Sequence, residues 1–60
     1  MKTIEIMSKD QRDYTINIFQ ITCLHEFTNE NGTLISLSCG TKIKTATAIH
    51  DLKEMIKKAS

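Results

Sequence analysis

The spacing of apolar residues changes once along the chain, after residue 45, and this change most constrains its fold. Up to that point, short runs alternate apolar and polar side chains, which is the period of a half-buried β-strand. Beyond it, apolar residues recur at the three- and four-residue spacing of one helix face. We therefore predict a mainly β, α+β fold: a small antiparallel sheet of about five strands over residues 3–45, with one helix over residues 47–59 packed on one face.

Turn residues divide the first 45 positions into these strands. Ser8–Gln11 and Gly40-Thr41 are turn sequences, and Asn31-Gly32 is a strong hairpin signal because both residues tolerate a positive φ. Phe19-Gln20 interrupts the alternation and predicts a bend or bulge between two consecutive strands. The expected strands are residues 3–7, 13–18, 21–27, 34–39 and 42–45.

The end of the chain has the charge pattern of a helix. Thr47 is the expected N-cap, Asp51 lies near the positive end of the helix dipole, and Lys57 and Lys58 lie near its negative end. The apolar face is predicted to consist of Ala48, Leu52, Met55, Ile56 and Ala59, with Ile49 beside them.

The length of the chain limits its core. A 60-residue chain buries only about 60% of its unfolded surface, and such small domains often depend on a partner subunit. We therefore expect a single domain over residues 1–60 that associates with a protein partner and forms a homodimer. The net charge of +1, from eight basic and seven acidic side chains, does not favour non-specific binding to nucleic acid.

The sequence also predicts the compartment. No apolar stretch approaches the roughly 18 residues needed to span a bilayer, and the segment MKTIEIMSKDQ lacks the hydrophobic run of a secretion signal. We expect a cytoplasmic protein without membrane contact. In that compartment Cys23 and Cys39 are expected to be reduced and to pack as small hydrophobes.

No residue set forms a recognisable catalytic, metal or cofactor motif. The soft metal ligands are Cys23, His25, Cys39 and His50, and their spacing lacks the close Cys-x-x-Cys pairs typical of structural zinc sites. A nucleophilic cysteine would also need a base and an orienting group, which the sequence does not identify. We therefore expect no enzymatic activity, no metal and no cofactor.

Two surfaces remain as candidates for binding. If one sheet face packs on the helix, Leu24, Phe27 and Leu34 are left on the other face, where an apolar patch would mark a protein interface. A lysine-rich edge late in the chain is the alternative, a nucleic-acid contact that the single arginine and the 5% aromatic content do not favour. Its candidate residues are Lys42, Lys44, Lys57 and Lys58.

Several segments resemble those of the small flagellar FlbD-type proteins, which are of about this length. They are the aromatic-x-aliphatic-Asn step at Tyr14–Asn17, the aliphatic-x-Leu-x-x-Gly-x-Lys hairpin at Ile35–Lys42, and the amphipathic helix with Leu52 and Ile56. This resemblance implies a small cytoplasmic accessory protein that acts through protein contacts.

The same segments resemble the first half of a LytTR-type DNA-binding domain, with Ala48–Leu52 at the start of its helix. The second half of that domain, which includes much of its DNA-contacting surface, has no counterpart among these residues. This resemblance implies a DNA-binding regulatory module that dimerises to complete such a surface. A third hypothesis is a phage or mobile-element protein that blocks a host protein.

Overall fold

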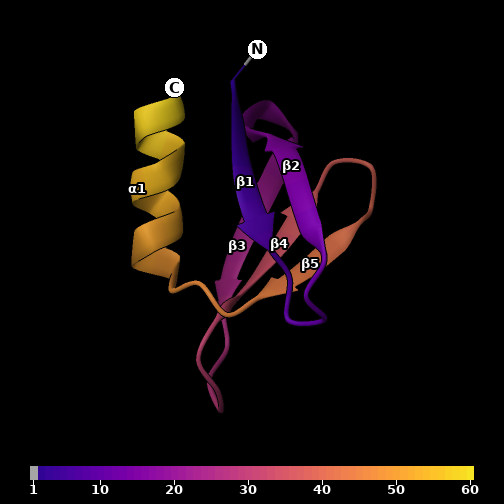
Figure 1. The fold of residues 1–60 in the computed structure, drawn as a ribbon, viewed down its shortest axis with the longest axis vertical. Helices are drawn as coiled ribbons and strands as arrows, with labels where there is room; N and C mark the ends of the chain where they lie inside the picture. The colour runs from indigo at the N-terminus through magenta and orange to yellow at the C-terminus, as the bar shows by residue number, and fades with distance from the viewer. Residues whose placement is uncertain (1) are drawn as a thin grey trace.

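The predicted fold class is confirmed by the structure, a computed structural model that describes residues 2–60. It contains five antiparallel strands and one C-terminal helix, in a mainly β, α+β arrangement (Figure 1). In chain order, the elements are β1 (Thr3–Met7), β2 (Asp13–Asn17), the 3₁₀ turn η1 (Ile18–Gln20), β3 (Ile21–Glu26), β4 (Thr33–Leu37), β5 (Lys42–Thr45) and α1 (Ile49–Ala59).

The five strands are divided between two sheets. β1 and β2 form a hairpin, and β3, β4 and β5 form a separate three-stranded sheet in that order. The interruption predicted at Phe19-Gln20 is η1, in which the Phe19 N–H donates to Asn17 Oδ1 at 3.0 Å and the chain leaves the first sheet. An isolated β-bridge between Ser8 and Thr45 links the end of the hairpin to β5.

The core lies between the inward faces of the two sheets. Ile4 and Ile16 face each other across the hairpin, and Ile35 and Ile43 do so across β4 and β5. Isoleucine suits these positions because its branched Cβ packs well on a pleated surface. The buried apolar side chains are Ile4, Ile6, Ile16, Ile18, Ile35, Ile43 and Leu52.

The helix closes one side of this core. α1 lies alongside β1 in Figure 1 and also contacts β3. Leu52 is fully buried, and Met55, Ile56 and Ala59 pack against the core, as the apolar spacing predicts. None of the helices within residues 2–60 is long and apolar enough to cross a bilayer.

The predicted N-cap at Thr47 is wrong. The helix begins at Ile49, and Ala48 occupies the N-cap position without a side-chain hydrogen bond. Thr47 is instead held before the helix, because its N–H donates to Thr45 Oγ1 at 3.3 Å and its carbonyl accepts from Thr33 Oγ1 at 3.0 Å. Thr33 and Thr45 are fully buried, so these bonds fix where the chain leaves β5.

The chain reverses at each of the three predicted turn sequences, but residues 27–32 form a longer loop between β3 and β4, in which Gly32 and not Asn31 has a positive φ. Ser8–Gln11 reverses the chain with Gln11 at a φ of 65°, and the Ser8 hydroxyl donates to the Asp10 carboxylate. That hydrogen bond lowers the pKa of Asp10 below its ordinary value. Gly32 ends the loop between β3 and β4 at a φ of 127°, where the Phe27 N–H donates to its carbonyl at 3.2 Å.

Candidate functional site

The outer face of the three-stranded sheet, which points away from the core, is the first candidate surface. In its central row, Leu34 on β4 lies opposite His25 on β3 and Lys44 on β5. Neighbouring Ile35 is fully buried, and side chains alternate along a strand, so Leu34 points outward. The next outward row consists of Cys23, Ser36 and Lys42.

This outer face has an apolar centre and a polar surround. Leu34 is half-buried, whereas His25, Lys42 and Lys44 are exposed. The Thr22 hydroxyl donates to the Ser36 carbonyl at 3.2 Å across the bulge in β3. The face is therefore positively charged at its β5 side, with Leu34 within reach of a partner.

The three residues predicted to share an interface do not share a face. Leu24 lies opposite Ile35 and packs against the core, so its expected place on the outer face with Leu34 is wrong. Direct cross-strand partners point to the same side of a sheet, and Ile35 points inward. Phe27 lies in the β3–β4 loop, where its ring is 4.7 Å from Lys9 Nζ. Only Leu34 remains on the outer face.

The four candidate lysines are likewise separated. Lys42 and Lys44 project from β5 on the outer face of the three-stranded sheet. Lys57 and Lys58 lie in the last turn of α1, and Lys58 borders a shallow hollow beside Thr3 and Ile4 of β1. The structure therefore divides the four lysines into two pairs, one on β5 and one at the end of α1.

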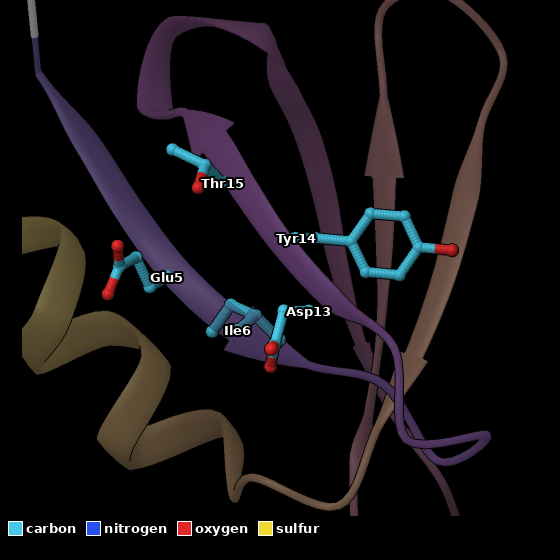
Figure 2. Close-up of a pocket in the computed structure, with 5 residues that line it drawn as sticks. All are labelled: Glu5, Ile6, Asp13, Tyr14 and Thr15. Carbon is cyan, nitrogen blue, oxygen red and sulfur yellow. The ribbon is translucent and has the colours of Figure 1, made fainter.

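The outer face of the β1–β2 hairpin carries acidic side chains. A hollow of about 250 Å³ is lined by Glu5, Ile6, Asp13, Tyr14 and Thr15. Figure 2 shows the two carboxylates and Thr15 on one side of the hairpin, while the Tyr14 ring extends the other way, toward β4 and β5. The two sheets thus present acidic and basic side chains on opposite sides of the molecule.

The second candidate surface is the outer edge of β2. The Ser8 N–H donates to the Arg12 carbonyl at 2.8 Å, and the Ile18 N–H donates to the Lys2 carbonyl at 3.1 Å. Hydrogen-bonded pairs recur at every second residue of an antiparallel hairpin, so the alternate residues direct their N–H and C=O groups away from β1. On β2, these outward-directed residues are Asp13, Thr15 and Asn17.

This edge has no strand beside it within residues 2–60, where β1 is the one partner of β2. Alternation identifies β2 as a strand in the sequence, but nothing in the alternation shows whether a strand lies at an edge. The sequence therefore gave no sign of this surface.

Both cysteines are free and exposed, so the expectation that they pack as small hydrophobes is wrong. Cys23 lies on the outer sheet face, and Cys39 lies in the β4–β5 turn with its Sγ 3.2 Å from Thr41 Oγ1. The Thr41 hydroxyl and then its backbone N–H lower the pKa of Cys39 below its ordinary value, because both stabilise the thiolate.

Histidine, cysteine and carboxylate side chains do not converge in the part of the chain that the structure describes. No group of three such residues within residues 2–60 could hold a metal ion. His25 lies in the Leu34 row, whereas His50 lies at the start of α1.

No known protein family, curated protein or solved structure matches this chain.

Proposed function

We propose that the chain is a non-enzymatic protein-interaction module that acts as a homodimer in a regulatory or accessory role. The observation that carries this proposal is half-buried Leu34, which lies between His25 and Lys44 on the outer face of the three-stranded sheet. An apolar centre within a polar rim is the usual anatomy of a protein interface. The partner that fits this face offers an apolar contact to Leu34 and carboxylates to Lys42 and Lys44.

Two further observations support the role and its place in the cell. Cys23 and Cys39 are free and exposed, which is typical of proteins in a reducing compartment such as the cytoplasm. The resemblance to FlbD-type proteins also implies a small cytoplasmic accessory protein. A phage or mobile-element protein that blocks a host protein would use the same face, and the identity of the captured partner distinguishes it.

The Leu34→Glu variant tests the proposal. We expect it to weaken partner binding by roughly 2 kcal/mol or more, because it removes the apolar centre and sets a carboxylate against an acidic partner. The partner is captured on the wild-type protein from a lysate of the source cells, purified, and titrated against each variant by calorimetry.

A matched variant separates this effect from a general change in charge. Met7 is 56% exposed on the outer face of the hairpin, so Met7→Glu makes the same kind of substitution on the opposite side. It should bind the partner as the wild type does. Equal affinity of Leu34→Glu and the wild type for that partner would refute the proposal.

A DNA-binding regulatory module is the second candidate function. It is favoured by Lys42 and Lys44, which project from one face together with His25. Fluorescence anisotropy with a short labelled duplex would then show an affinity that falls steeply with salt and is lost in the Lys42→Glu/Lys44→Glu double variant. Undetectable binding at low salt removes this alternative.

A further inference from the structure

We infer that the second copy in the proposed homodimer pairs through the outer edge of β2, antiparallel to itself about a two-fold axis at Thr15. This inference rests on the proposed dimer and names the surface that forms it. The two hairpins would then join into one four-stranded sheet in the order β1, β2, β2 and β1. The interface is isologous, as expected of a two-fold dimer.

The other strand edges are already covered or protected. α1 lies against β1 and β3. At β5, the Lys44 carbonyl accepts from the Lys9 N–H at 2.8 Å, and lysines occupy positions 42 and 44. Edge lysines are a common device against strand pairing. β2 has the sequence DYTIN, without proline, lysine or a bulge, so its edge is open to another strand.

The hydrogen-bonding directions limit the possible registers. Asp13, Thr15 and Asn17 direct their N–H and C=O groups outward, and in an antiparallel ladder such residues must face one another. With the axis at Thr15, each Thr15 faces its counterpart and each Asp13 faces Asn17 of the second copy. This arrangement uses all three outward-directed residues.

The registers shifted toward Asp13 are less favourable. Placing Asp13 opposite Asp13 sets like charges directly across the ladder, which is destabilising. Placing Asp13 opposite Thr15 brings Gln11 into the ladder, yet Gln11 has a φ of 65° and belongs to the turn. The register at Thr15 avoids both problems.

The inward side of the same register also fits. Tyr14 and Ile16 alternate with the outward-directed residues, so each half-buried Tyr14 lies opposite Ile16 of the second copy. Aromatic and β-branched residues form favourable cross-strand pairs. The contact extends the core across the axis, which suits a chain with a small core of its own.

Charged substitutions at Thr15 test the proposed two-fold axis, because the axis places the two copies of this residue opposite each other. Thr15 is exposed on the outer face of the hairpin and lies opposite Glu5 of β1, so Thr15→Lys should fold. Thr15→Glu sets a second carboxylate against Glu5 within the hairpin, and circular dichroism checks that it folds. Each variant sets like charges opposite each other at the axis, and its dimer dissociation constant should rise several-fold. An equimolar mixture places lysine opposite glutamate, and it should form a heterodimer with an affinity close to that of the wild type.

Sedimentation equilibrium over a concentration series measures the dimer, and native mass spectrometry counts the heterodimer in the mixture. Lys42→Glu, a charge change on the β5 edge, is the matched control and should leave the dimer unchanged. Thr15→Pro provides a second route, because its lost N–H points away from β1 and the hairpin keeps its own hydrogen bonds. Circular dichroism confirms folding, and this variant should be monomeric.

Each contrary result has a distinct meaning. A wild-type protein that stays monomeric throughout the series overturns both this inference and the dimer in the proposed function. If the wild type dimerises and all three Thr15 variants dimerise equally well, the β2 interface is wrong, whereas the dimer of the proposed function stands. If Thr15→Lys and Thr15→Glu each dimerise weakly and their mixture forms no tighter heterodimer, the axis at Thr15 is wrong. None of these measurements depends on partner binding at Leu34, so the two proposals fail separately.

Discussion

Gly32 lies where the β3–β4 loop packs against the end of β5, and the backbone there leaves no room for a side chain. Its φ is 127°, and a Cβ there would collide with the carbonyl oxygen of Thr45. Gly32→Ala should therefore lower the free energy of unfolding by about 3 kcal/mol or more, combining left-handed strain with a backbone clash. Urea unfolding measures the change.

Gly40 provides the matched comparison. Its φ is 94°, but a Cβ at this position meets no atom within 4 Å. Gly40→Ala should lower the free energy of unfolding by only about 1 kcal/mol, which is the strain of the left-handed conformation. If the two variants were equally stable, the collision with Thr45 would have no part in the conformation of the loop.

Cys39 gives a pH-dependent prediction at the same scale. Thr41 lowers the pKa of this exposed thiol, so a larger fraction is thiolate at a given pH. Thr41→Val removes the hydroxyl and should raise the pKa. In a Cys23→Ser background, the rate of iodoacetamide alkylation should then reach half its maximum at a higher pH in Thr41→Val than with Thr41 present. Identical pH profiles would contradict the role of the hydroxyl.

Among the elements, α1 can be stabilised by a substitution at its N-cap. Ala48 is the N-cap and makes no side-chain hydrogen bond, although serine at an N-cap accepts one from the first turn. Ala48→Ser should raise the free energy of unfolding by about 0.5–1 kcal/mol, measured by urea unfolding. Ala46→Ser, at an exposed position before the helix, should leave it unchanged. A gain at both positions would show that capping is not the cause.

Two strands with a similar sequence pattern, β2 and β5, have edges that differ in how well they are protected from pairing. β2 and β5 are both short alternating strands, yet lysines flank the outer edge of β5 and none flanks that of β2. The Lys9 N–H also bonds to β5, which holds the first turn against that edge. This difference at the level of elements is the basis of the dimer inferred at Thr15.

At the scale of the whole molecule, packing two sheets face to face places the charged residues of their outer faces on opposite sides. Glu5 and Asp13 lie on the outer face of the hairpin, and Lys42 and Lys44 lie on the outer face of the three-stranded sheet. The dimer inferred at β2 keeps the Leu34 face of each copy free. A dimer of this form therefore offers a partner two identical basic faces with apolar centres.

The strands, the helix and the turns can be predicted from the sequence, because strand and helix periods and the turn residues are local signals. The sequence therefore predicted the five strands, a chain reversal between β3 and β4, and most of the apolar face of α1. The division of the strands between two sheets is seen only in the folded chain, because strand pairing joins residues far apart in the sequence. That pairing placed Leu24 in the core, kept Leu34 outside, separated Lys57 and Lys58 from Lys42 and Lys44, and left the edge of β2 open.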